Sequence, residues 1–578
     1  MSTCPNCKKH FEDGTKFCDV CGTPVVQDTV DVAPQADASA AVPFKITDKM
    51  IKIGVAVLAA VLVVAILISA LFPVAKNNAY AYVKDDELYF STVSKAKGEQ
   101  VTTKMFDGVT SSSVGGFTRI SEDGKRIFYV DKYDGAGYDL YYKKTSGLKK
   151  DGIKIASGIK SYDISENGGR VTYIKDTDKL YQHNLKEQGD KIDDEVDCFV
   201  ASANGKKILY VKSEDLEYED VHDEYDDYGY YGDSSFTEND LYLSKNGKAG
   251  EKVVSGYDEL YYISDGLDYV VYTKGGALYT QKIGKDAVKV DSDVSGVIQV
   301  YDSGEIYYVV SEESEDGTED SLYYYSGKKD PVLVSDEYGS YSSYAQEKAT
   351  VAFYSISYDD SYEPDYTYYI AVKDKAFTID YEIDSVDINL DGKTMYFIAD
   401  VNEETEEGDL YSAKITSKGI DKAKKVDSDV YGGYYVGDGK YLYVKDYDSD
   451  KECGQVYFNN KKVGDDVEWD YNILYIEKTN SLLFFTDVDD ENMGSLYIFK
   501  GSKATKVLDD VYVYGITLTP DSDVLFLADY SGNGATRSGT MYILKGKKAK
   551  KLDDDVTQIV SLYTRESYDL IARYRMMY

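Results

Sequence analysis

The sequence offers few of the residue patterns that carry hydrolytic chemistry. It has three histidines, of which only His183 and His222 follow the apolar segment near residue 60, and His222 lies in a long acidic stretch where we expect it to face solvent. Neither the GxSxG pattern of a nucleophile elbow nor the HExxH pattern of a zinc protease occurs. Carboxylates are too abundant to single out a catalytic pair. These absences predict that the chain is not an enzyme.

Cysteine is also scarce, and its placement is uneven. Four of the six cysteines lie within the first 21 residues. They form two Cys-x2-Cys pairs separated by ten residues, namely Cys4, Cys7, Cys18 and Cys21. Two such pairs can close a tetrahedral site of four thiolates around zinc. The remaining two, Cys198 and Cys453, are far apart in sequence, and we expect buried free thiols rather than a disulfide.

The first 22 residues resemble the short bacterial zinc-ribbon family. The resemblance rests on CPNC (4–7) and FCDVCG (17–22), and it departs from the family at Lys8, where many ribbons have glycine. It implies a structural Zn²⁺ whose binding supplies the folding energy of a very small core. A redox dithiol pair or an iron site is the alternative. We expect the ribbon (1–22) to dock a cytosolic protein and residues 23–50 to form a flexible linker.

A single long apolar run follows the linker. Residues 53–72 contain no charge, and a helix of this length spans about 30 Å, the thickness of the hydrocarbon core of a bilayer. We therefore predict one transmembrane helix over 51–75. More lysines precede the run than follow it closely, and the clustered cysteines suit a reducing compartment. The predicted localisation is the cell membrane, with the N-terminus cytosolic and the large C-terminal part extracellular.

Acidic residues dominate the charge of the chain. Asp and Glu number 103 against 65 Lys and Arg, which gives a net charge of −38. This charge disfavours nucleic acid as a partner and favours cations or basic proteins. The chain also contains 60 Tyr, a residue that favours β-strands.

A repeated unit of about forty residues occupies the rest of the chain and predicts its fold. Residues 118–157 read as four short strands separated by turns, and the same order of segments returns from residues 163, 201, 389 and 519. Four antiparallel strands per repeat are typical of a β-propeller blade. The SEDGKRIFYV segment followed by DLYY is similar to the TolB-type, WD-repeat-like propeller family, and this likeness extends over 79–578. An open β-solenoid or separate sandwiches are the alternatives.

The number of repeats exceeds a single ordinary ring. Ten complete copies lie between residues 115 and 555, with a partial copy before them (79–105) and another after them (556–578). Because single propellers have about four to eight blades, we predict two tandem β-propellers, 79–335 and 336–578, in a mainly β fold. The two partial copies are expected to complete a shared blade.

Charge alternates along each repeat. Acidic segments fall between the second and third strands and between repeats, whereas lysines gather between the third and fourth strands. In a four-stranded blade these two kinds of turn lie at opposite ends, so one face should be acidic and the other basic. The acidic loops are either solvated turns or Ca²⁺ sites, although they do not match the EF-hand spacing. The possible calcium ligands are Asp131, Asp134, Asp139, Asp487, Asp489 and Asp490.

These features together predict a membrane-anchored surface protein. The leading hypothesis is a binding or scaffolding protein, whose propellers bind an extracytoplasmic protein or glycan and whose zinc ribbon docks a cytosolic partner. The alternatives are a calcium-dependent adhesion protein and an ectoenzyme acting on glycans or peptides. Fold likeness does not decide between them, because propellers carry many functions.

Overall fold

The computed structural model divides the chain into two compact units, Met1–Val74 and Ala75–Tyr578. It describes residues 2–3, 10–11, 78–95, 97–102, 116–185, 189–215, 237–314, 317–358, 364–437, 439–469, 473–532 and 537–560. In the first unit, β1 (Ser2–Thr3) pairs with β2 (His10–Phe11) in an antiparallel sheet.

Several predictions for the first unit fall on residues outside this description. They are the four zinc-ribbon cysteines, the linker and the transmembrane helix over 51–75. Among the residues described, no helix is long and apolar enough to cross a membrane. The zinc site and the membrane span therefore stay predictions.

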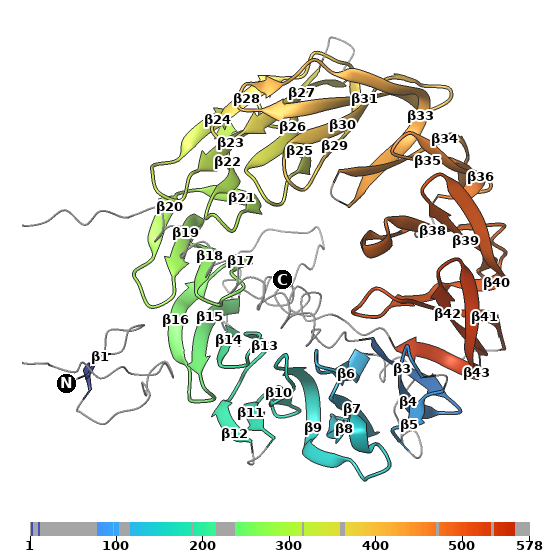
Figure 1. Cartoon of the computed structure of the whole chain (residues 1–578). Coiled ribbons are helices and arrows are strands. Elements are labelled where there is room, and N and C mark those ends of the chain that lie inside the picture. The colour runs from blue at the N-terminus through green and yellow to red at the C-terminus, as the bar shows by residue number, and fades with distance from the viewer. Residues whose placement is uncertain are drawn as a thin grey trace, which may run out of the picture. The chain divides into compact units, whose positions relative to one another are not determined.

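The second unit is built from antiparallel sheets that follow one another in chain order (Figure 1). We call each set of four successive strands a blade and number the blades along the chain. Blade 1 contains β6 (Arg119–Ile120), β7 (Arg126–Tyr133), β8 (Tyr138–Lys144) and the first half of β9 (Ile153–Ile164). Blade 2 contains the second half of β9, β10 (Arg170–Lys175), β11 (Leu180–Asn184) and β12 (Asp190–Asp193).

The next four blades are separate four-stranded sheets. Blade 3 contains β13 (Cys198–Ala201), β14 (Lys207–Asp215), β15 (Thr237–Lys245) and β16 (Glu251–Tyr257). Blade 4 contains β17 (Leu260–Ile263), β18 (Tyr269–Lys274), β19 (Ala277–Lys282) and β20 (Val288–Asp291). Blade 5 contains β21 (Val294–Val300), β22 (Ile306–Ser314), β23 (Gly317–Tyr325) and β24 (Val332–Ser335). Blade 6 contains β25 (Ser340–Tyr344), β26 (Thr350–Tyr358), β27 (Pro364–Val372) and β28 (Lys375–Thr378).

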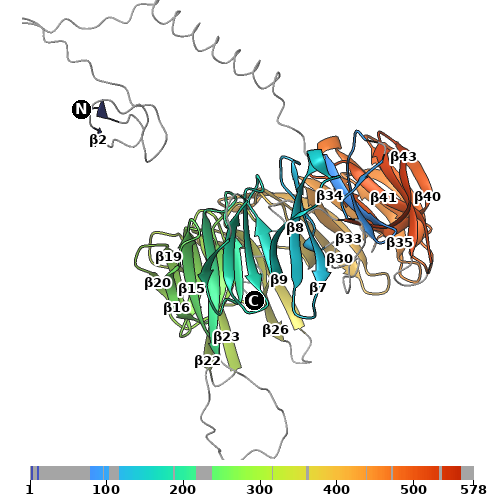
Figure 2. The same ribbon diagram turned by 90° about the horizontal axis from the view of Figure 1, so that it is seen from below.

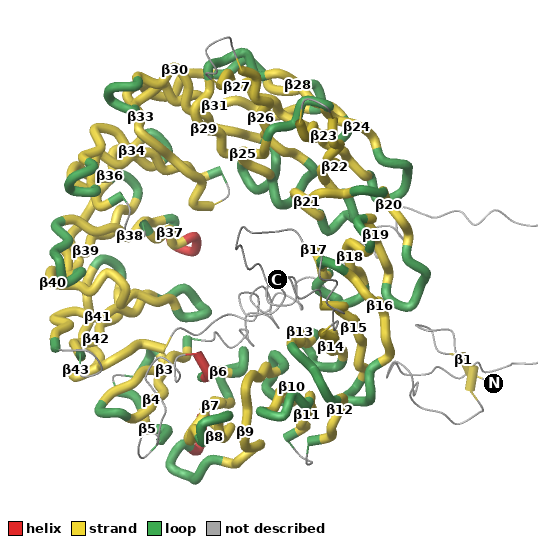
Figure 3. The backbone as a smooth tube through the Cα atoms, turned by 180° about the vertical axis from the view of Figure 1, so that it is seen from behind, coloured by secondary structure: helices red, strands yellow, loops and turns green. Residues whose placement is uncertain are grey.

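The remaining blades share strands with their neighbours. Blade 7 contains β29 (Ile383–Ile388), β30 (Thr394–Asn402), β31 (Glu407–Thr416), the short β32 (Gly419–Ile420) and the first half of β33 (Lys424–Gly437). Blade 8 contains the rest of β33, β34 (Lys440–Asp448), β35 (Cys453–Phe458) and β36 (Lys461–Glu468). Blade 9 contains β37 (Leu474–Ile476), β38 (Ser481–Thr486), β39 (Met493–Lys500) and the first half of β40 (Lys503–Leu518). Blade 10 contains the rest of β40, β41 (Val524–Ser531), β42 (Ser538–Lys545) and most of β43 (Lys548–Val560). Two 3-10 helices, η1 (Thr145–Gly147) and η2 (Glu477–Thr479), interrupt the strands (Figure 3).

The last blade joins the two ends of the second unit. In blade 11 the end of β43 pairs with β3 (Ala79–Lys84), which is followed by β4 (Glu87–Thr92) and β5 (Glu99–Gln100). The register places Ala81 opposite Val560 and Tyr82 opposite Ile559. This pairing confirms the prediction that the two partial copies complete one blade. Over the described residues the strand order thus gives eleven blades.

Long strands such as β9 serve two blades because they bend in the middle. Residues up to Ile159 pair with β8, and residues from Ile159 onward pair with β10. The bend contains Gly158 with φ +67°, and a Cβ there would lie 2.9 Å from the Asp176 carboxyl. Only glycine combines this dihedral with this close approach. The repeat pattern alone did not predict such shared strands.

Tyrosines pair across the two central strands of most blades. The rings of Tyr173 and Tyr181 are stacked 5.5 Å apart on directly opposite residues, and those of Tyr443 and Tyr457 are 5.0 Å apart. Cross-strand aromatic pairs of this kind contribute about 0.5–1.5 kcal/mol beyond their burial. This repeated pairing accounts for much of the tyrosine content.

Hydrophobic clusters connect each blade to the next. One cluster joins blades 11, 1 and 2, and the others join successive blades as far as blade 11. The cluster between blades 5 and 6 packs Tyr324 with Phe353, across the predicted domain boundary at residue 336. Hydrophobic side chains pack between blades 5 and 6 as they do between the other successive blades. The division into 79–335 and 336–578 gains no support from it and stays a prediction.

A hydrogen bond recurs at four junctions between blades. An aspartate at the end of one blade accepts a bond from a tyrosine hydroxyl on the second strand of the next blade, over 2.5–3.0 Å. The pairs are Asp193–Tyr210, Asp291–Tyr308, Asp427–Tyr443 and Asp553–Tyr82. We call these the junction hydrogen bonds. They show that one acidic residue of each such connection is used within the fold.

Candidate functional site: an acidic pocket

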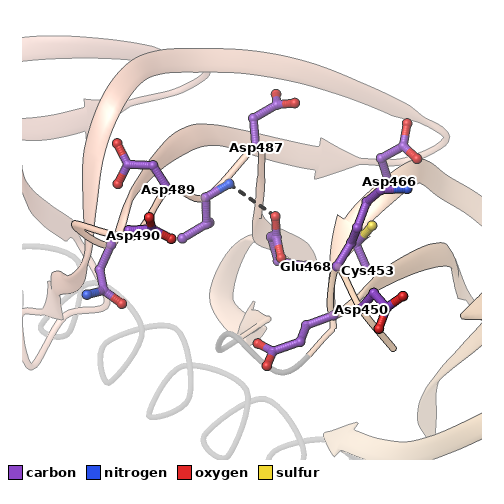
Figure 4. Close-up of a pocket in the computed structure, with 11 residues that line it drawn as sticks. Asp450, Cys453, Asp466, Glu468, Asp487, Asp489 and Asp490 are labelled. Carbon is purple, nitrogen blue, oxygen red and sulfur yellow. Dashed lines mark hydrogen bonds between the residues drawn. The ribbon is translucent and has the colours of Figure 1, made fainter. Parts of the chain in front are cut away.

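A pocket of about 560 Å³ lies between blades 8 and 9. Its walls come from the hairpin joining β34 to β35, from the end of β36, and from the loop joining β38 to β39 (Figure 4). The lining residues are Asp450, Lys451, Glu452, Cys453, Asp466, Glu468, Asp487, Val488, Asp489, Asp490 and Asn492.

Backbone geometry explains part of this acidity. Glu452, Asp466, Asp487 and Asn492 all have positive φ, from 31° to 63°. Asp and Asn are enriched in this left-handed region because their short polar side chains hydrogen-bond locally. Asp489, which has no positive φ, also bonds locally, since its Oδ1 accepts hydrogen bonds from the backbone N–H groups of the residues two and four positions later, both over 2.9 Å.

Glu468 holds the two blades together at the floor of the pocket. It is 6% exposed, and its Oε1 accepts a hydrogen bond from the Val488 backbone N–H over 3.1 Å (Figure 4). Beside it, burial raises the pKa of the Cys453 thiol, and the charge of Glu468 raises it further. Cys453 is therefore held as an unreactive thiol. Cys198 and Cys453 are not joined in a disulfide, as predicted, although only Cys453 is buried.

Negative charge dominates the pocket. Seven of the eleven lining residues are acidic, and the only basic one is Lys451. Its Nζ lies 2.7 Å from Oδ2 of Asp448, so that lysine is already paired. Within the described parts of the chain, no group of three or more His, Cys, Asp or Glu side chains is arranged to hold a metal ion. The negative charge of the pocket can attract a cationic group.

The structure separates the two sets of predicted calcium ligands. Asp487, Asp489 and Asp490 line the pocket, whereas Asp131, Asp134 and Asp139 lie on the hairpin joining β7 to β8 in blade 1. No observation tests calcium binding at either set, which stays a prediction.

The hairpin of blade 1 uses its carboxylates locally. Lys154 Nζ lies 2.7 Å from Oδ2 of Asp139. Backbone N–H groups of Gly137 and Ala136 bond to Asp134 and lower the pKa of its carboxyl. Burial, and then the charge of Asp139, raises the pKa of Asp131.

Sequence reasoning missed Asp466 and Glu468. They lie at the end of β36, where the chain leaves blade 8 for blade 9, and this end of a blade shares a face with the second-to-third-strand loops. Applying that rule to the segment DDVEWD (465–470) would have placed them beside Asp487. The available signal was therefore the topology of the blade.

No protein-family model matches the chain, and no curated protein matches it. Similar solved structures include a eukaryotic initiation factor, with 10% identity over 75% of this chain and 97% of that chain and a TM-score of 0.36. TolB from Acinetobacter baumannii matches with 13% identity over 45% of this chain and 64% of that chain, at a TM-score of 0.21. An acylaminoacyl peptidase from Pyrococcus horikoshii matches with 13% identity over 66% of this chain and 57% of that chain, at a TM-score of 0.23.

These likenesses concern the fold alone. The mainly β architecture of four-stranded antiparallel blades is confirmed by the strand pairing. The prediction that the chain is not an enzyme is contradicted, because proteins of similar fold include a peptidase. The physical reason is that a propeller does not determine function. Missing hydrolase motifs were therefore insufficient ground for that exclusion.

Proposed function

We propose that the chain is a single-pass membrane protein that binds a positively charged ligand outside the cell. The blades form the ligand-binding part, and the acidic pocket between blades 8 and 9 is the binding site. The zinc ribbon formed by Cys4, Cys7, Cys18 and Cys21 docks a protein on the cytosolic side.

The acidic pocket carries this proposal. It has seven carboxylates, and its only lysine is already paired with Asp448. A hydrogen bond to a charged group contributes about 1.5–3 kcal/mol, so a few such bonds are enough for a weak but specific ligand. The uncharged run over 53–72 and the spacing of the four cysteines support the anchor and the ribbon.

Ligand binding is tested by calorimetry on the full chain in detergent micelles, with spermine as the cationic probe. The double variant Asp466→Asn and Asp489→Asn should lower the affinity for spermine at least about tenfold, because it removes two charges from the pocket. The matched control is Asp286→Asn with Asp330→Asn, which removes two exposed carboxylates from the lysine-rich turns. An equal loss of spermine affinity in both variants would show that spermine is attracted by the net charge of the chain. That result would contradict binding in the pocket.

The anchor and the ribbon need separate measurements. Cells that produce the full chain should retain it in the membrane fraction, and external protease should digest the blades but not the ribbon. Zinc emission from the purified chain should give one Zn²⁺ per chain, and Cys18→Ser should abolish it, because structural sites need all four ligands. A chain recovered in the soluble fraction would contradict the anchor.

A further inference from the structure

A second surface lies on blade 6, well along the chain from the acidic pocket. On β26 the side chains of Tyr354, Ile356 and Tyr358 share one face, and on β27 Tyr366 and Tyr368 lie opposite the first two of these. We call these five residues the aromatic face. The ring of Tyr354 lies 5.5 Å from that of Tyr366 and 5.5 Å from that of Tyr368.

The outer part of the aromatic face is open to solvent. Ile356, Tyr358 and Tyr366 are 39%, 67% and 48% exposed. The neighbouring strands stop short of them, because β25 pairs with β26 only as far as Tyr354 and β28 pairs with β27 only from Tyr369. The rest of the hairpin is a two-stranded ribbon. Such a ribbon is only marginally stable in water, and a contiguous exposed apolar face of this kind marks an interaction site.

Acidic hairpins flank this ribbon on both sides. In blade 5 the hairpin joining β22 to β23 carries the exposed residues Glu312, Glu313 and Glu319. In blade 7 the hairpin joining β30 to β31 carries the exposed residues Glu403, Glu404 and Glu406. Among the described residues none of these six glutamates forms an ion pair. They are available to a ligand.

Hydrogen bonds place the β26–β27 hairpin between strands of blade 5 and blade 7. The Tyr338 N–H donates to the carbonyl of Asp320 in the blade 5 hairpin over 3.1 Å, and the next N–H, of Gly339, donates to the carbonyl of Tyr354 over 2.8 Å. On the other side the Tyr368 hydroxyl donates to the carbonyl of Asp384, just inside β29, over 3.1 Å. Figure 2 shows β22, β23 and β26 reaching the same side of the second unit.

We propose that the aromatic face and its flanking glutamates form a docking surface for a basic polypeptide segment rich in lysine and arginine. Charge complementarity and the rings together favour this partner. Tyrosine rings attract ammonium and guanidinium groups, and the methylene stems of lysine and arginine pack against such rings. The glutamates of the blade 7 hairpin then pair with the charged ends, because Tyr354 and Tyr368 of the aromatic face pack toward blade 7. The inference adds a surface and a partner to the proposed function, and it does not depend on the pocket.

The test uses the full chain in detergent micelles and an oligolysine peptide as the probe. In the double variant Tyr358→Ser and Tyr366→Ser the rings are lost at constant charge, and oligolysine affinity should fall about tenfold. The matched control is Tyr514→Ser, because Tyr514 is 61% exposed on β40 in another part of the chain. The oligolysine affinity of this control variant should stay within about twofold of that of the unchanged chain, as expected for a substitution outside the docking surface.

A second pair of variants separates this surface from the acidic pocket. Replacing Glu403, Glu404 and Glu406 by Gln should weaken oligolysine binding. The pocket variant, Asp466→Asn with Asp489→Asn, should keep most of its oligolysine affinity. If only the pocket variant loses oligolysine binding, the inference of a docking surface is wrong and the proposed function stands. If the tyrosine variant binds oligolysine unchanged, the inference is also wrong. Binding of a neutral oligosaccharide that the tyrosine variant abolishes, without oligolysine binding, would identify a carbohydrate surface instead and overturn the basic partner.

Discussion

The junction hydrogen bond that closes blade 11 should be the most informative single bond to remove. Tyr82 is fully buried, and its hydroxyl donates to Oδ2 of Asp553 over 2.7 Å. Asp553 also pairs with Lys84 Nζ over 2.9 Å, and its side chain is 10% exposed. Tyr82→Phe keeps the ring and removes this donor to a charged acceptor, and it also removes the acceptor of the Gly98 backbone N–H, which lies 3.2 Å from the hydroxyl. We expect a cost of about 1.5–3 kcal/mol, the usual value for a hydrogen bond to a charged group.

Hydrogen exchange measured by mass spectrometry localises this cost. Because local opening governs exchange, amides of β3 and the end of β43 should exchange about ten to a hundred times faster in Tyr82→Phe. The matched control is Tyr542→Phe in β42, where the ring stacks 5.6 Å from Phe526 and the hydroxyl has no hydrogen bond within the described residues. Unchanged exchange in β3 and β43 would refute the reasoning. Equal acceleration throughout the second unit would show that β3 and β43 do not open separately from the rest of that unit.

Three further predictions concern pH, backbone and calcium. Burial raises the pKa of Asp427, but hydrogen bonds from Lys445, the Ser428 N–H and Tyr443 outweigh it and lower that pKa. The folded chain thus favours the carboxylate, so the stabilisation is present above the unfolded pKa of about 3.9 and is lost as pH falls through the lower folded value. The urea midpoint should drop as pH falls below about 4, and less so in Asp427→Asn. Asp529 is exposed with φ +52°, so Asp529→Val should destabilise by about 1–2 kcal/mol and Asp529→Gly should not, as denaturation would show. If the six predicted aspartates bind Ca²⁺, calcium should raise the melting temperature of the full chain, and Asp139→Asn with Asp489→Asn should remove the rise; no rise in the original chain would contradict calcium binding.

The sequence was a good guide to local structure and a poor guide to larger arrangement. The strands around DLYYKK and TMYILK were predictable because hairpin turns and alternating residues fix a blade locally. The closing pair β43 and β3 was also predictable, since each end carried part of a repeat. The way successive blades pack was not, because it depends on hydrophobic clusters between sheets, such as the one that contains Tyr324 and Phe353, that no repeat displays.

The candidate sites show the same limit. Half of the pocket could be predicted from the acidic loop that contains Asp487 and Asp489. Glu468 could not be recognised as part of it, because its role depends on a bond to Val488 in the next blade. The acidity itself was an ambiguous signal, since aspartates such as Asp400, Asp487 and Asp529 occupy left-handed positions that the backbone requires.

The pairing of β3 with β43 has a consequence for biosynthesis. Tyr82 and Asp553 are 471 positions apart, so at about 5–20 residues per second the ribosome needs roughly half a minute to a minute and a half to supply the partner strand. Until then one edge of β3 has no neighbour, and an unpaired hydrophobic edge promotes aggregation. The first strand of the second unit is thus among the last to be completed. A chaperone that covers nascent β-strands should matter more for this chain than for a protein whose first sheet closes at once.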